Sequence, residues 1–125
     1  MNMKLTENFN LEEFHCKDGT SVPAELIGNA IELAKNLQVL RGYLKMPVMI
    51  NSAYRTVVYN ASVGGVKDSQ HLLAKAADIT CKKLTARQLS RIIEQLIESG
   101  KMKDGGLGVY PGFVHYDIRD KKARW

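Results

Sequence analysis

The sequence contains little cysteine and no long apolar run, and each shortage excludes a class of protein. Its two cysteines, Cys16 and Cys81, lie far apart and form no Cys-x-x-Cys pair. We therefore expect reduced thiols, and neither a disulfide framework nor a cysteine-ligated zinc site. No apolar segment approaches the roughly 20 residues that a membrane-spanning helix needs. Because Glu7 precedes any apolar stretch, we also expect synthesis in the cytoplasm without a secretory signal peptide.

What the chain does contain is ordinary for a globular protein. It has 125 residues, of which 45% are apolar and 25% are charged. A chain of this length can bury a core without disulfides, and no linker, internal repeat or low-complexity segment divides it. We predict a single domain over residues 1–125 and expect a monomer.

The charge balance points weakly to an anionic partner. Lys and Arg total 18 against 13 Asp and Glu, which gives a net charge of +5. This sign suits an anionic cell-wall polymer, and it suits simple solubility equally well. The positive charges are scattered, with one dense run at residues 121–124, and no nucleic-acid-binding motif accompanies them. Nucleic-acid binding would rest on net charge alone, and we do not expect it.

Apolar spacing predicts an α+β fold. Helical periodicity covers residues 21–43, and a second helix begins at the capping box of Thr85 and Gln88 and ends at Gly100. Residues 51–69 have no regular pattern and are predicted to form a long loop. We predict a short helical turn over residues 8–15. We also predict four short strands, at residues 47–50, 74–80, 105–110 and 113–119. Because strands and helices do not alternate, we expect a small antiparallel sheet packed against two main helices.

Histidine is also scarce, and two of the three histidines have a suggestive setting. His71 precedes Asp78 by seven residues, and His115 lies in the last predicted strand. Zinc accepts imidazole nitrogen and carboxylate oxygen, and a catalytic site uses three protein ligands and leaves one position to water. The spacing alone leaves a structural role open for these residues, and we expect His15 to be structural.

Asp117 is expected to face the same side of its strand as His115. Two roles are open for this carboxylate. It can be the general base that takes a proton from the water and delivers it to the leaving amine. It can instead orient His115 through the ring nitrogen that does not bind the metal. The aromatic residues Tyr110 and Trp125 are expected to serve packing.

Three separated motifs resemble those of zinc D-alanyl-D-alanine carboxypeptidases and related phage endolysins. Residues 69–79 are similar to the Ser-x-His-x-x-Gly-x-Ala-x-Asp signature, residues 52–56 to a Ser-x-Tyr-Arg-Ser/Thr element, and residues 113–119 to a closing Phe-Val-His-x-Asp-x-Arg pattern. The motifs occur in the family's order. The chain departs from it at Ala74, where the signature prefers glycine, and at Gly112, where several relatives carry a glutamate.

The resemblance implies the Hedgehog/DD-peptidase fold and a Zn²⁺ ion held by His71, Asp78 and His115. It implies that Arg55 holds a carboxylate or carbonyl of the substrate, although a surface ion pair is the alternative for this side chain. Residues Ser69 and Gln70 would donate to the substrate, or would simply cap a turn.

The function that this resemblance implies is zinc-dependent hydrolysis of peptidoglycan stem peptides. The enzyme would be either a D-Ala-D-Ala carboxypeptidase or an endopeptidase, as in an endolysin. The alternative is a non-catalytic, zinc-containing cell-wall-binding module of the same fold. We expect action on the cell wall after release from the cytoplasm, as for a phage-encoded lysis enzyme.

Overall fold

A mixed sheet forms the centre of the computed structural model, which describes residues 3–125. Within these residues the sheet has five strands in the order β1-β2-β4-β3-β5. Neighbouring strands pair antiparallel except β3 and β5, which are parallel. The strands are β1 (Met49–Ser52), β2 (Ala76–Thr80), β3 (Gly106–Val109), β4 (Val114–Asp117) and β5 (Ala123–Arg124). The predicted α+β fold with its small sheet is therefore confirmed, with β5 as an addition that the sequence did not predict.

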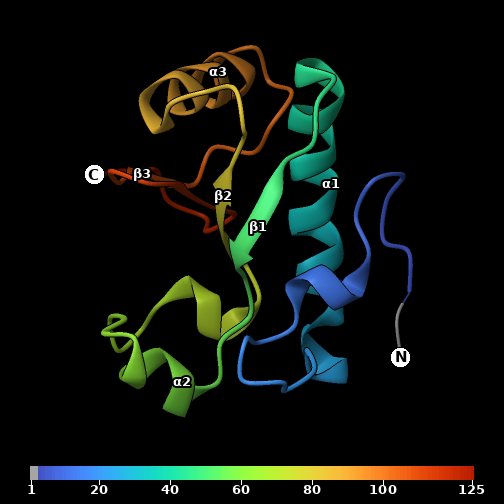
Figure 1. The fold of residues 1–125 in the computed structure, drawn as a ribbon, viewed down its shortest axis with the longest axis vertical. Coiled ribbons are helices and arrows are strands. Elements are labelled where there is room, and N and C mark those ends of the chain that lie inside the picture. The colour runs from blue at the N-terminus through green and yellow to red at the C-terminus, as the bar shows by residue number, and fades with distance from the viewer. Residues whose placement is uncertain (1–2) are drawn as a thin grey trace.

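Two main helices cover this sheet, as predicted. Helix α1 (Ile27–Leu44) follows the 3-10 helix η2 (Ala24–Leu26), and α3 (Ala86–Glu98) begins at the predicted capping box of Thr85 and Gln88. Figure 1 shows α1 running beside β1, with α3 at one end of the molecule. None of the helices in residues 3–125 is both long and apolar enough to cross a bilayer.

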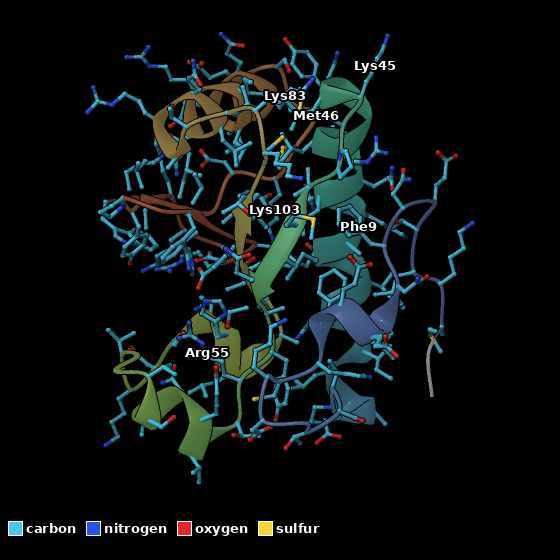
Figure 2. All side chains as sticks on the ribbon, in the orientation of Figure 1. Phe9, Lys45, Met46, Arg55, Lys83 and Lys103 are labelled. Atoms are coloured by element: carbon cyan, nitrogen blue, oxygen red, sulfur yellow. The ribbon has the colours of Figure 1, made fainter. Side chains whose placement is uncertain are left out.

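The N-terminal segment closes the core from the side of α1. The short helix η1 (Leu11–Phe14) lies within the predicted turn over residues 8–15. The Phe9 ring is buried and packs edge-on against Phe14, with ring centroids 6.3 Å apart. Figure 2 shows Phe9 pointing inward from this segment. The segment is thus part of the single hydrophobic core.

The predicted loop over residues 51–69 is partly helical, which corrects the sequence-based expectation. It contains helix α2 (Val57–Ser62), which begins at Thr56, whose hydroxyl accepts a hydrogen bond from the Tyr59 amide. Val57 and Val58 are 75% and 79% exposed. Because α2 buries only Asn60, its sequence has no apolar periodicity that could have revealed a helix.

Strand register decides which side chains meet on the open face of the sheet. Asp78 on β2 is the cross-strand partner of His115 on β4. Successive residues of a strand point to opposite faces, and the neighbours of these two residues belong to the hydrophobic core; these neighbours are Ala77, Ile79, Val114 and Tyr116. Asp78 and His115 therefore lie side by side on the face that is turned away from the core.

Candidate metal centre

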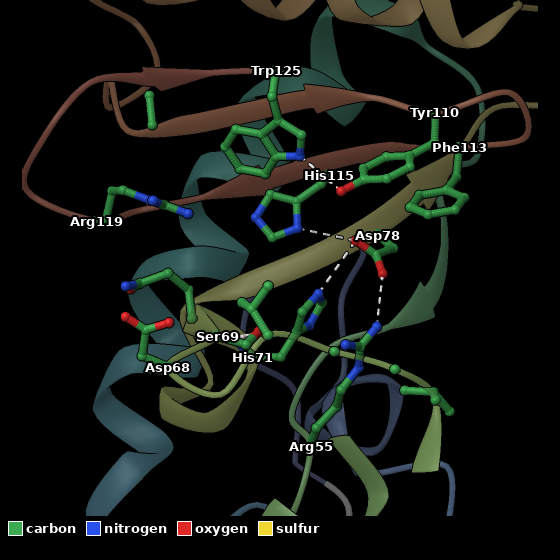
Figure 3. Close-up of a pocket in the computed structure, with 16 residues that line it drawn as sticks. Arg55, Asp68, Ser69, His71, Asp78, Tyr110, Phe113, His115, Arg119 and Trp125 are labelled. Carbon is green, nitrogen blue, oxygen red and sulfur yellow. Dashed lines mark hydrogen bonds and ion pairs between the residues drawn. The ribbon is translucent and has the colours of Figure 1, made fainter. Parts of the chain in front are cut away.

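The three predicted metal ligands converge in the structure. Oδ1 of Asp78 lies 3.3 Å from Nε2 of His71 and 3.2 Å from Nδ1 of His115. One ligand atom from each residue lies within 4.8 Å of the others. A tetrahedral zinc ion with bonds of about 2.0–2.2 Å separates its ligand atoms by roughly 3.3–3.6 Å. The separations thus suit one ion between the three side chains (Figure 3).

Backbone contacts around the 3-10 helix η3 (Gln70–Leu73) orient His71. The Ser69 hydroxyl caps η3 by accepting the amide hydrogen of His71, at 3.1 Å. The ring Nδ1 of His71 lies 2.6 Å from the carbonyl oxygen of Ala53. Because a carbonyl can only accept, Nδ1 carries the hydrogen. The lone pair of Nε2 in the neutral ring therefore faces Asp78.

Asp117 orients His115 in the same manner. Its Oδ2 lies 2.7 Å from Nε2 of His115, so this nitrogen donates and Nδ1 faces Asp78. When both imidazoles are neutral, two nitrogen lone pairs and a carboxylate oxygen face one another. Only a cation, either a proton or a metal ion, stabilises such an arrangement. The donor set therefore fits a divalent metal.

Burial and hydrogen bonding shift the pKa values of Asp78 and His115 in opposite directions. Burial by itself would raise the pKa of Asp78, but the bonds with His115 and His71 outweigh it and hold this pKa below its usual range. Burial likewise would lower the pKa of His115, yet Asp117 and Asp78 raise it. Asp78 is thus an anion at neutral pH, as a metal ligand must be.

The structure places Asp117 beneath the site and not in the cleft. Its carboxylate has no exposed surface. Its oxygens accept hydrogen bonds from the backbone amide of Gly106 and from Nε2 of His115. They also accept from both the backbone amide and the guanidinium of Arg119. A Cβ at Gly106 would overlap this carboxylate. The geometry therefore favours the orienting role of Asp117 over proton transfer to a water in the cleft.

Arg55 is committed to the metal site itself. Its Nη2 lies 3.2 Å from Oδ2 of Asp78, its Nε donates to Ser52, and its Nη1 donates to Asn60. This ion pair is largely buried, because the two side chains are only 14% and 9% exposed, so it is not the surface pair considered above. It ties down the outer oxygen of Asp78 and leaves Oδ1 for the metal. Contact between Arg55 and a substrate stays a prediction.

The three ligands lie on the floor of a cleft of about 500 Å³. One wall is the segment around residues 63–70, which includes Ser69 and Gln70. The other wall is formed by the aromatic side chains of Tyr110, Phe113 and Trp125, with the cation of Arg119 beside them. The cleft is open to solvent, so a small ligand can reach the three side chains on its floor.

Two residues of the aromatic wall correct the sequence-based expectation of packing. Tyr110 and Trp125 are 37% and 47% exposed and line the cleft. The position of Tyr110, in the turn just before the strand that carries His115, could have indicated that it lies near the metal site. The place of Trp125 in the cleft depends on the parallel pairing of β5 with β3, which the two residues of β5 are too few to predict.

A comparison with protein families decides the relationship. A family model described as Peptidase M15 matches residues 4–117, a span that contains all three metal-ligand candidates. The chain belongs to the peptidase M15 family. Membership supports peptidase activity, and the peptidases of this family depend on zinc. No curated protein matches the chain.

Ala74, where this M15 peptidase departs from the signature, has a strained backbone. Ala74 adopts φ 57° at the end of η3, a left-handed conformation that favours glycine. The family signature prefers glycine at this position. The turn that carries His71 keeps its geometry with alanine because the turn is closed by hydrogen bonds from the Ala74 and Lys75 amides to the carbonyls of His71 and Gln70.

Proposed function

We propose that this M15 peptidase uses Zn²⁺ to hydrolyse peptide bonds in bacterial peptidoglycan stem peptides. The observation that supports the proposal is the buried set of His71, Asp78 and His115 on the floor of an open cleft. In a hydrolytic zinc site, three protein ligands leave one position free for water or substrate. The proposed activity is that of a D-Ala-D-Ala carboxypeptidase or of an endopeptidase.

The residues of the chain have distinct parts in this proposal. A bound zinc ion supplies Lewis-acid polarisation of the scissile carbonyl and lowers the pKa of water to about 7. Asp117 holds the ring of His115 by its Nε2–H, and the carbonyl of Ala53 does the same for Nδ1–H of His71. Arg55 keeps one oxygen of Asp78 turned away from the metal.

The proposed substrate class rests on the motifs and on the two arginines of the cleft. Arg55 and Arg119 line the cleft and pair with Asp78 and Asp117, and their remaining N–H groups can bind a carboxylate such as that of a stem peptide. The net charge of +5 suits docking on an anionic wall polymer. We further propose that a monomer acts on the cell wall after release from the cytoplasm, as a phage-encoded enzyme would.

A second candidate is a wall-binding module that holds zinc without turnover. One observation favours it. Among the described residues that line the cleft, Asp68 is the only carboxylate besides the ligand Asp78. Asp117 is buried, and position 112, where several relatives carry glutamate, holds glycine. A proton acceptor for hydrolysis is therefore less evident than the metal site itself.

Two measurements on the purified chain test the proposal. Elemental analysis should give about one zinc per chain, with loss of the metal in His71→Ala and retention in His15→Ala, because His15 lies outside the site and accepts a hydrogen bond from the Val22 amide. Incubation with purified peptidoglycan should release amines, and mass spectrometry of the fragments identifies the bond that is cut.

Each outcome separates the candidates. Zinc with turnover supports the peptidase, and fragments that lack only the terminal D-alanine assign a carboxypeptidase. Zinc with wall binding and no turnover supports the binding module. A His71→Ala protein that keeps its zinc would overturn both.

A further inference from the structure

The aromatic wall of the cleft holds one hydroxyl in a defined orientation. The rings of Tyr110 and Phe113 stack at a centroid distance of 4.5 Å and an angle of 11°. The indole of Trp125 lies against the ring of the metal-ligand candidate His115, with centroids 5.0 Å apart. Figure 3 shows the Tyr110 hydroxyl pointing along this wall toward the indole nitrogen of Trp125 and the ring of His115.

The hydrogen bond of this hydroxyl determines what it can offer a ligand. Nε1 of Trp125 lies 2.7 Å from the hydroxyl oxygen of Tyr110. An indole nitrogen can only donate, so the tyrosine oxygen accepts and its own O–H is left to donate. In the described part of the chain, no acceptor takes that hydrogen. Tyr110 therefore presents a hydrogen-bond donor to the cleft.

Strand β5 keeps the indole in place. The backbone of Trp125 pairs with β3, since its amide donates to Leu107 and its carbonyl accepts from Val109. A Cβ at Gly108 would overlap the indole, so only glycine lets the ring lie on the strand. The Arg119 guanidinium covers the indole, 5.3 Å from its centroid. These contacts hold the indole in the orientation in which its N–H donates to Tyr110.

We propose that Tyr110 is a further catalytic residue, whose hydroxyl donates a hydrogen bond to the scissile carbonyl oxygen as negative charge develops on it. Trp125 is its positioning residue. This inference rests on the proposed peptidase function. Donors that are held in advance where an oxyanion forms contribute about 10²–10³ in kcat. Three of the five N–H groups of Arg55 are already bonded to Asp78, Ser52 and Asn60, whereas the O–H of Tyr110 has no acceptor in the described part of the chain.

Steady-state kinetics of the zinc-loaded full chain, with the stem peptide that mass spectrometry identifies as substrate, test this role. Tyr110→Phe should lower kcat about 100-fold, with KM changed less than about 2-fold and zinc content unchanged. Tyr43→Phe is the matched control, because Tyr43 is a 56% exposed tyrosine on α1. Trp125→Phe should lower kcat by a smaller factor. The double variant should be no slower than Tyr110→Phe alone, because the indole acts through the hydroxyl.

A binding measurement gives a readout that does not depend on turnover. Calorimetry with a phosphinic analogue of D-alanyl-D-alanine, whose tetrahedral anion mimics the charged intermediate, should show weakening of at least about 10-fold in Tyr110→Phe. Binding of the substrate peptide itself, whose scissile carbonyl carries no charge, should change little.

The outcomes are distinguishable. If the wild-type chain turns over and Tyr110→Phe keeps its kcat and its affinity for the analogue, the role of Tyr110 is refuted and the peptidase stands. An effect on KM alone, or loss of zinc in Tyr110→Phe, also refutes it. If the wild-type chain neither cleaves the peptide nor binds the analogue, the proposed function itself fails.

Discussion

The floor and the aromatic wall of the cleft differ in how completely their polar groups are paired. On the floor, His71, Asp78 and His115 are 3%, 6% and 7% exposed, and their outer atoms are held by Ala53, Arg55 and Asp117, so that only the atoms that face one another are left for a cation. On the wall, Tyr110 and Trp125 are 37% and 47% exposed and keep free surface. The orientation of the three metal-ligand candidates is thus built into the fold, whereas the wall keeps surface that a substrate can contact. Changes to the two regions should therefore separate metal affinity from turnover.

The largest effect is expected at the centre of the floor. Asp78→Asn removes the only anionic ligand candidate of the set, so zinc affinity should fall more than about 100-fold and hydrolysis should be lost. Chelator competition measures the affinity. Tyr110→Phe, on the wall, should bind zinc as the wild-type chain does. Equal zinc affinity in Asp78→Asn and the wild type would erase the distinction between floor and wall.

The next largest effect is expected at Asp117, which lies beneath the floor and holds His115. Asp117→Asn should weaken zinc binding by about 10- to 100-fold, because the amide no longer holds the Nε2–H of His115 as a carboxylate does. Asp120→Asn is the control, since that side chain is 87% exposed. A variant with wild-type zinc affinity and a much lower kcat would instead restore Asp117 as the general base.

A smaller effect is expected at Arg55, which lies between the floor and the wall formed by residues 63–70. Arg55→Lys keeps the charge but loses the planar fork that joins Asp78, Ser52 and Asn60. We expect about a 10-fold fall in kcat/KM, measured with the stem peptide, and a modest loss of zinc affinity. Arg91→Lys, an exposed position on α3, should change neither quantity.

The smallest effect concerns the turn that carries His71. Ala74→Gly relieves a left-handed backbone that costs about 1–2 kcal/mol in a residue with a Cβ. It also removes a buried methyl group, worth about 0.8 kcal/mol, and adds backbone freedom to the unfolded chain. The free energy of unfolding by urea should change by less than about 1 kcal/mol. A loss above about 2 kcal/mol would show that the methyl contact outweighs the strain.

Prediction from the sequence succeeded where local pattern and chemistry agree. Apolar periodicity located α1 and α3, and the capping box at Thr85 placed the start of α3. It failed for α2, because a helix with exposed valines has no buried stripe to detect. It also missed β5, whose two residues are too few to carry a pattern.

The candidate metal ligands could be named from the sequence, because imidazole and carboxylate groups bind metals wherever they lie in a chain. It also determined the family, through motifs that keep their order along the chain. The burial of Asp117 beneath His115 and the hydrogen bond from Trp125 to Tyr110 became visible with the folded chain. The physical reason is that strand alternation defines the face of a side chain, whereas its neighbours depend on pairing between strands that are distant in the sequence.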